Sequence, residues 1–347
     1  MGVLVRFLTV VTTISLCASA HGYTIHSKPA IHEAITELAE ACVDHASGAR
    51  PQDCWKNDGP IIGASKPFSE LEKAVRWPDD PTRQLNGASI GKLAVNLLGN
   101  CKKVLKANDA IYSAGLLCSS HYGRLQFMHA MASADADNDV QSRAKMLAWA
   151  HFTFLVASGK IALDQNICDL MQGDPILAGA FAPRAGKQCD DPSGYAQWTV
   201  RTFFTFTCGN WFSSVTCKVP TPGEKADALA RMAARGALLH MIQDSYSASH
   251  AARTIGEFPS EAGPYTAQIS CLFPRHFYQY DKQNPSVHGK ADRPPVKATS
   301  CASINEADDA VTASAVTLWS LRPESGVSAE DYIAYLKARV FGPDMTS

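Results

Sequence analysis

The chain has 347 residues, of which 46% are hydrophobic and 19% are charged, the composition of a globular protein with a sizeable core. Its formal net charge of -1 carries no excess of Lys and Arg, which argues against non-specific binding to nucleic acid. We therefore expect no nucleic acid partner.

The N-terminus has the pattern of a secretion signal. Arg6 precedes an apolar run over residues 7–16 that is too short to span a bilayer, and small residues then fit a cleavage site. We expect removal of residues 1–20, so that the mature chain begins at His21; a cut two residues later would leave Tyr23. No later segment is long and apolar enough to cross a membrane. The sequence thus predicts a secreted or periplasmic protein without a transmembrane segment.

The cysteines agree with export. Of the eleven cysteines, Cys17 lies in the signal, and an even number remains, which indicates disulfides in an exported chain. Pairing in sequence order, for example Cys42 with Cys54, is one hypothesis among the connectivities that the sequence leaves open. No CxxC pair occurs, so a zinc site built from thiolates is not expected.

Helical periodicity dominates the mature chain. Three predicted helices cover residues 30–42, 139–162 and 223–244. Two more are predicted near the C-terminus, one after a capping box of Ser303 and Glu306 and one that starts at residues 328–331. Strand signals are sparse, and residues 202–208 fit either a short strand or a helix end. We predict an all-α fold, a single multi-helix domain over residues 21–347.

Two segments interrupt this helical pattern. Residues 168–222 form a cysteine-rich insertion, interpreted as an elaborated loop or subdomain, and residues 254–299 are rich in Pro and Gly. Long irregular segments in compact domains are usually functional or tied by disulfides. We therefore expect disulfide-tied loop insertions on a helical body.

The segment around residue 240 carries the strongest chemical pattern. His240 and Asp244 lie four residues apart on a predicted helix, so both side chains share one face and can hold the same ion. His250 follows just beyond the helix end, where the chain can turn back. Small residues that would allow close approach of another helix lie beneath them at Ala233, Gly236 and Ala237. Taken alone, the pattern also fits a buried structural His and an exposed Asp.

Further His and Asp residues are each ambiguous by themselves. His288 and Asp292 repeat the HxxxD spacing but could form a surface turn, and Asp79 follows Trp77-Pro78, where a helix is expected to end. His129 follows an apolar run, and His32 lies at the edge of an apolar helix face; both could be core residues. Together these residues supply the neutral imidazole and carboxylate ligands of hydrolytic zinc.

The order of these motifs resembles the zinc-dependent phospholipase C family of bacteria and its relatives, the fungal single-strand-specific nucleases. The family signature is H-x3-D-x5-H followed by H-x3-[DE], with an upstream W-x-D, a His on an apolar segment and an N-terminal H-x-x-I-x-x-x-A. The matching positions are His240, Asp244 and His250; His288 and Asp292; Trp77 and Asp79; His129; and His32, Ile35 and Ala39. His121 and Asp80 are rivals of His129 and Asp79.

The resemblance implies a helical domain around a buried cluster of about three zinc ions. The first ion would be held by Asp79, His129, His240 and Asp244, and the second by His250, His288 and Asp292. Asp244 would bridge to the third, which His32 and the mature N-terminus would share. Asp79 would also be catalytic, orienting or deprotonating the attacking water.

The resulting expectation is a zinc-dependent phosphodiesterase of the phospholipase C type, acting as a monomer on phosphatidylcholine or similar phospholipids at a membrane surface. Two alternatives stay open at this point. One is a nuclease or nucleotidase on the same cluster, which would need base-stacking aromatics and a basic groove. The other is a non-catalytic binding protein held together by disulfides. A loop with Phe258, Tyr265, Phe273, Phe277 and Tyr278 could contact lipid or form core.

Overall fold

The protein is mostly helical and contains two small two-stranded sheets, as the sequence predicts for an all-α fold. The computed structural model describes residues 30–55, 61, 67–81, 101, 105, 115–133, 137–181, 198–211, 214–258, 260, 261, 263, 265, 269–284, 287, 288, 291 and 306–343. The predicted signal peptide, the two alternative mature N-termini and Asp292 lie outside these residues. No helix among the described residues combines the length and apolar character needed to cross a membrane.

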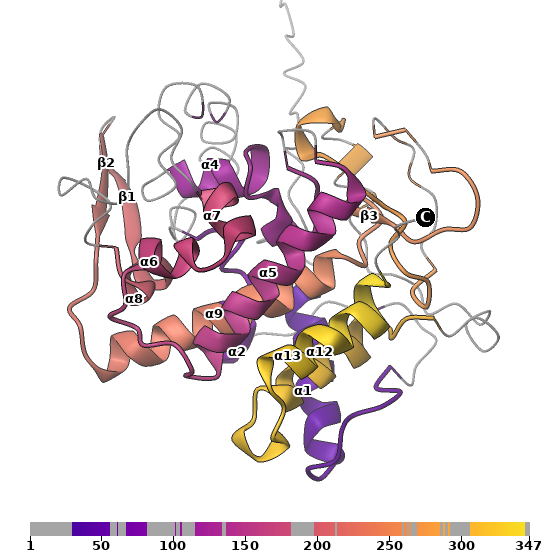
Figure 1. The fold of residues 1–347 in the computed structure, drawn as a ribbon, viewed down its shortest axis with the longest axis horizontal. Coiled ribbons are helices and arrows are strands. Elements are labelled where there is room, and N and C mark those ends of the chain that lie inside the picture. Colours follow the sequence, from indigo (N-terminus) through magenta and orange to yellow (C-terminus); the bar gives the residue numbers. More distant parts are fainter. Residues whose placement is uncertain are drawn as a thin grey trace, which may run out of the picture.

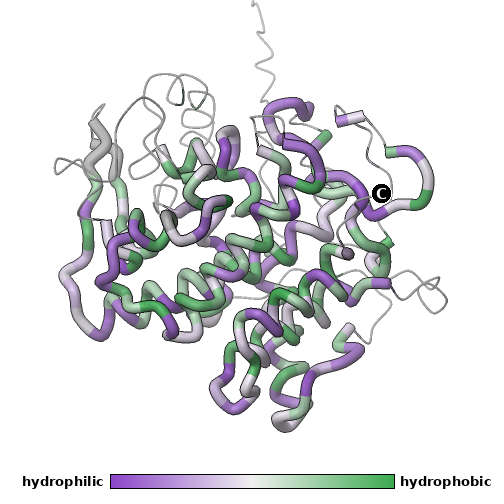
Figure 2. Tube along the Cα trace, in the orientation of Figure 1, coloured by the Kyte–Doolittle hydropathy of each residue, from purple (hydrophilic) through white to green (hydrophobic). Residues whose placement is uncertain are grey.

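Four long helices form the body of the molecule (Figure 1). These are α1 (Ile31–His45), α5 (Asp139–Ala157), α9 (Glu224–Asp244) and α12 (Ala310–Ser320). Helices α5 and α9 lie side by side across the middle, and α1 packs on α12. Figure 2 shows hydrophobic positions recurring along these central helices. The candidate site lies where the N-terminal end of α1 meets the C-terminal end of α9.

Shorter elements complete the fold. The helices are α2 (Glu70–Ala74), α4 (Gly115–Tyr122), α6 (Ile167–Gln172), α7 (Pro175–Phe181), α8 (Val200–Thr205) and α13 (Ala329–Leu336). The 3-10 turns are η2 (Gln126–His129), η3 (Tyr280–Lys282) and η4 (Pro323–Ser325), and η5 (Lys337–Phe341) is a π-helical turn. The antiparallel strand pairs are β1 (Thr207–Trp211) with β2 (Ser214–Lys218), and β3 (Ala251–Ala252) with β4 (His276–Phe277).

Local capping chemistry sets several helix ends. The predicted capping box of Ser328 and Asp331 is present at the start of α13. The predicted start of α12 is wrong, because the Asp309 side chain accepts from the backbone of Val311 and Thr312 and begins the helix there. Helix α5 also ends earlier than predicted, at Ala157, where Gly159 (φ 79°) takes the left-handed conformation that stops a helix.

Part of the cysteine-rich insertion belongs to the core. Helix α8 of this segment packs on α9, and Phe203 and Phe204 surround the buried Trp149 and Trp77. Residues 202–208, predicted as either a short strand or a helix end, contain both, since α8 ends there and β1 begins. The segment is therefore more than a surface loop, because its aromatic residues anchor Trp77, two residues before Asp79.

Disulfides join Cys42 to Cys54, Cys101 to Cys118 and Cys208 to Cys217. These three pairs follow the order of the sequence, as the pairing hypothesis predicts. Cys168 and Cys271 are also in disulfides. The Cys208–Cys217 bridge links directly opposed residues of the β1–β2 hairpin. Such bridges are typical of proteins from oxidising compartments.

Candidate metal centre

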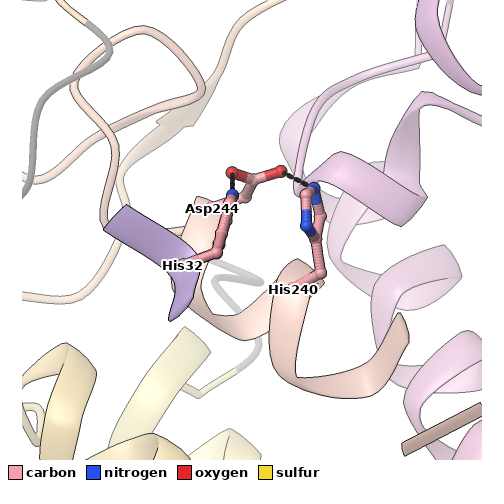
Figure 3. Close-up of side chains that lie close together, drawn as sticks. All are labelled: His32, His240 and Asp244. Carbon is pink, nitrogen blue, oxygen red and sulfur yellow. Dashed lines mark ion pairs between the residues drawn. The ribbon is translucent and has the colours of Figure 1, made fainter. Parts of the chain in front are cut away.

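The last turn of α9 presents His240 and Asp244 on the same face, as their spacing predicts. Nε2 of His240 lies 2.9 Å from Oδ2 of Asp244, and both side chains are fully buried. His32, the second residue of α1, places its Nε2 3.3 Å from the other carboxylate oxygen, Oδ1. Figure 3 shows the Asp244 carboxylate bridging the edges of the two imidazole rings, with one oxygen toward each. The contact joins residues more than two hundred positions apart in the chain.

Gly236 allows α2 to reach the site. A Cβ on Gly236 would lie 2.2 Å from the carbonyl carbon and oxygen of Ala74, so only glycine permits this approach. The approach brings the Val75 carbonyl to His240, whose Nδ1 donates to it at 2.8 Å. Asp79 follows in the turn after α2, its Oδ1 3.6 Å from Nε2 of His240. The close contact that the small-residue stripe predicts is therefore confirmed.

His129 enters from η2. Its Nδ1 lies 3.0 Å from Oδ2 of Asp244, 3.0 Å from Nε2 of His240 and 3.9 Å from Oδ1 of Asp79. The following residue, Ala130, has a φ of 50°, a left-handed conformation that is unfavourable for alanine. Fully buried surroundings hold this turn in place. The turn ends η2 at the residue that points toward Asp244.

His250 and His288 form the far side of the cluster. Their rings are stacked with centroids 5.3 Å apart, and both are buried. Nδ1 of His250 donates to the His129 carbonyl at 2.7 Å, and it lies 3.4 Å from Oδ2 of Asp244. His288 is thus no surface turn, even though it lies in a polar segment.

The structure brings together every predicted ligand that it describes: His32, Asp79, His129, His240, Asp244, His250 and His288. Two groups within the described residues have ligand atoms that lie mutually within 4.8 Å and can hold a metal ion. They are His32, His240 and Asp244, and Asp79, His129 and His240. Neither rival residue, Asp80 or His121, is in these two groups, although the His121 ring lies 4.6 Å from that of His129. The role of these residues as ligands stays a prediction.

Hydrogen bonds to carbonyl oxygens fix which imidazole nitrogen faces the carboxylate. A carbonyl oxygen can only accept, so Nδ1 of His240 is the N–H group that donates to Val75. In the neutral ring, the other nitrogen, Nε2, then presents a lone pair. Nε2 of His240 lies 2.9 Å from Oδ2 of Asp244, and this carboxylate oxygen is also an acceptor. Two acceptors at this distance need a proton or a cation between them. A metal ion fits this arrangement, since carbonyl-bound histidines are typical of metal sites.

The charge states also suit a metal ion. Burial lowers the pKa of His240 to about 3, and burial likewise lowers the pKa of His129 and of His288. Burial alone would raise the pKa of Asp244, but the surrounding histidines hold it well below its usual value. Neutral imidazoles and an ionised carboxylate are the protonation states that bind metal.

Sequence reasoning missed the groups behind these histidines. Gln243 receives a hydrogen bond from Nδ1 of His32 at 2.7 Å, and Gln283 is bonded to Nδ1 of His288. No local sequence pattern indicated Gln243, because the residue next to Asp244 on a helix points toward a different neighbour. The partners of both glutamines depend on the packing of distant segments.

The predicted aromatic loop divides between core and surface. Phe277 and Tyr278 are buried, Tyr265 and Phe273 are half-buried, and Phe258 is 41% exposed. The expectation that these aromatic residues form core is therefore right for Phe277, which lies in β4, and for Tyr278, which follows it.

Comparisons of the chain with models of protein families, with curated proteins and with solved structures find no match.

Proposed function

We propose that this chain is a zinc-dependent hydrolase of phosphate esters, with phospholipid as its substrate and a reaction of the phospholipase C type. The observation that carries the proposal is the position of Asp244. Its carboxylate faces His32 at 3.3 Å and His240 at 2.9 Å in a buried site, with Asp79 and His129 beside it. A buried set of imidazoles and carboxylates without thiolates is the donor set of catalytic zinc.

The residues that would hold zinc include the two described groups. His240 is in both groups and would serve a single ion, because its Nδ1 is bonded to the Val75 carbonyl. His250 and His288 would hold a further ion together with Asp292, as the family resemblance implies. Zinc in such a site supplies positive charge that activates water near neutral pH and neutralises the transferring phosphoryl group. We expect about three ions, since the donors exceed what one four-coordinate ion can use.

Asp79 would orient the attacking water. Its side chain is 1% exposed, and Oδ1 lies 3.6 Å from His240 and 3.9 Å from His129. A carboxylate at the edge of the cluster can accept a proton from water within hydrogen-bond reach. The same negative charge balances the cations that the histidines hold.

Phospholipid is preferred over nucleic acid because the chain lacks the Lys and Arg excess that a polyanionic substrate favours. Secretion is part of the proposal, since the disulfides suit an oxidising compartment and the first residues have the pattern of a signal peptide. We further propose a monomer acting at the membrane surface.

Product analysis tests the proposal. The purified mature protein is incubated with phosphatidylcholine vesicles or with single-stranded DNA, with and without chelator, and zinc is then restored. We expect diacylglycerol and phosphocholine from the vesicles, loss of both products with chelator, and recovery with zinc. The Asp244→Asn variant, purified in the same way, controls for contaminating hydrolases.

Two results would contradict the proposal in different ways. Cleavage of DNA without cleavage of lipid would replace the phospholipid substrate with nucleic acid on the same metal centre. No chelator-sensitive hydrolysis of either substrate or of a small phosphodiester would reject the hydrolase itself and favour a binding protein.

A further inference from the structure

Two buried glutamines lie behind the histidines of the candidate metal centre. Gln243 contacts His32 through its Oε1, and Gln283 contacts His288 in the same way. Both glutamine side chains are at least nine-tenths buried, so their amide groups must be satisfied by protein. Neither belongs to the predicted ligand set.

The orientation of the Gln243 amide follows from its neighbours. The hydroxyl of Thr36 donates to the His32 carbonyl at 2.8 Å, and the hydroxyl of Ser314 donates to the Ala310 carbonyl at 2.7 Å. With their protons committed, both hydroxyls can only accept, and Gln243 Nε2 donates to them at 3.1 and 3.4 Å. The carbonyl oxygen of Gln243 must therefore face His32.

This orientation fixes the tautomer of His32. Since Gln243 Oε1 can only accept, Nδ1 of His32 carries a proton and donates across 2.7 Å. Nε2 is thus the nitrogen of His32 left to bind an ion, and it lies 3.3 Å from Oδ1 of Asp244. The glutamine occupies Nδ1 and leaves Nε2 directed toward the candidate metal centre.

Gln283 acts on His288 by the same logic. Its Nε2 donates to the Ser249 carbonyl at 2.5 Å, so its Oε1 is the atom that receives Nδ1–H of His288. Nε2 of His288 is buried and has no hydrogen-bond partner within the described part of the chain. Its ring is stacked on that of His250, which lies beside Asp244.

We propose that Gln243 and Gln283 are positioning residues that hold His32 and His288 as Nδ1–H tautomers, with Nε2 available as a metal ligand. The inference rests on the metal centre proposed above. Without such a partner, a neutral imidazole exchanges between two tautomers, and one of them places a proton where the ion must bind. Residues that orient ligand histidines typically contribute roughly 10- to 100-fold to metal affinity.

Competition titrations of the full-length mature protein with zinc and a chromophoric chelator test this role. Gln243→Met and Gln283→Met keep the side-chain length but remove the acceptor, and we expect each to weaken zinc binding by roughly 10- to 100-fold. Because His32 and His288 lie on different sides of the cluster, the two variants should weaken different binding steps. Thr317→Val is the matched control, since it removes a buried hydroxyl of α12 that is bonded to Ala313 and Tyr332 and not to Gln243.

Nitrogen-15 spectra of the histidine side chains in the metal-free protein give a readout independent of activity. The wild type should show His32 and His288 protonated at Nδ1, and each Met variant should show a mixture of tautomers at its own histidine only. Thermal unfolding in chelator verifies that the variants are folded; if Gln243→Met is not, Gln283→Met carries the test alone.

Wild-type affinity and unchanged tautomers in the folded Met variants would overturn the positioning role. An equal loss of affinity in Thr317→Val would also overturn it, because packing would then explain the effect. A wild-type protein that binds no zinc would instead reject the metal centre, and with it the purpose of both glutamines.

Discussion

Gly236 of α9 lies directly against Ala74 at the end of α2, so that a Cβ on Gly236 would be 2.2 Å from the Ala74 carbonyl. This contact positions the carbonyl of Val75 at His240 and the turn that carries Asp79. Gly236→Ala should therefore destabilise the fold by about 1–3 kcal/mol through overpacking and lower zinc occupancy. Denaturant unfolding with metal analysis measures both effects.

Gly179→Ala is the control for this substitution. Gly179 also lies in a helix, α7, but a Cβ there would meet nothing within 4 Å. Removing a helical glycine at an open position should leave stability unchanged or raise it by about 0.5–1 kcal/mol. If Gly236→Ala behaved like Gly179→Ala, the close approach would have no part in forming the site.

Asp79 and Asp80 offer a second matched pair. They are adjacent and both buried, yet only Asp79 belongs to a group that can hold metal within the described residues. Asp79→Asn should lower hydrolysis on the order of 100-fold or more, whereas Asp80→Asn should retain most activity and zinc. Initial rates and zinc content of the two variants measure this difference. A larger loss of activity in Asp80→Asn than in Asp79→Asn would assign the catalytic role to Asp80.

Asp244→Asn should reduce zinc content and turnover more than Asp292→Asn. The Asp244 carboxylate faces His32, His240 and His129, while Asp292, outside the described residues, is predicted from the sequence to serve one ion. The amide keeps the shape of the side chain but removes the charge that balances the cations. Equal zinc stoichiometry and rates in the two variants would argue against a bridging Asp244.

Metal removal should lower the melting temperature. The candidate ligands come from α1, η2, α9 and the turn after α2, so an ion joins segments that are distant in the chain. Zinc at about 100 times its Kd should stabilise the folded state by roughly 2.7 kcal/mol. Calorimetry with and without chelator measures the shift, which the Asp244→Asn variant should largely lack. An unchanged wild-type melting temperature would mean that no ion links these segments.

His276 should make stability depend on pH. Its hydrogen bond to Asp139, followed by that to Glu261, raises its pKa from 6.5 to about 9 against the effect of burial. A raised pKa means that the folded state holds the proton more tightly than the unfolded chain. The stabilisation is thus complete below about pH 6.5 and is lost as pH rises through about 9.

The measurement compares the wild type with His276→Gln, both saturated with zinc. The free energy of unfolding of the wild type should fall more steeply between pH 6.5 and 9 than that of the variant. The contact ties β4 to the first residue of α5, through Nδ1 of His276 and Oδ1 of Asp139 at 3.1 Å. If the free energy of unfolding depended on pH equally in the two proteins, this ion pair would not contribute to the pH dependence of stability.

Local patterns in the sequence determined the helical character and much of the candidate site. The spacing of His240 and Asp244 fixes their common face because helical geometry depends only on neighbours along the chain. The capping box at Ser328 follows from a similarly short-range rule. The three described disulfides join successive cysteines, which is one of the connectivities that the sequence left open. The order of the His and Asp motifs indicated which residues to expect together.

Only the tertiary structure decided how those residues meet. The contacts of His32 with Asp244 and of His240 with Val75 require α1, α2 and α9 to pack at particular positions, which no local pattern specifies. Gln243 has no distinguishing sequence feature, because its role depends on the hydroxyls of two other helices. Periodicity is a property of one segment, whereas the direction of a lone pair depends on all the segments packed around it.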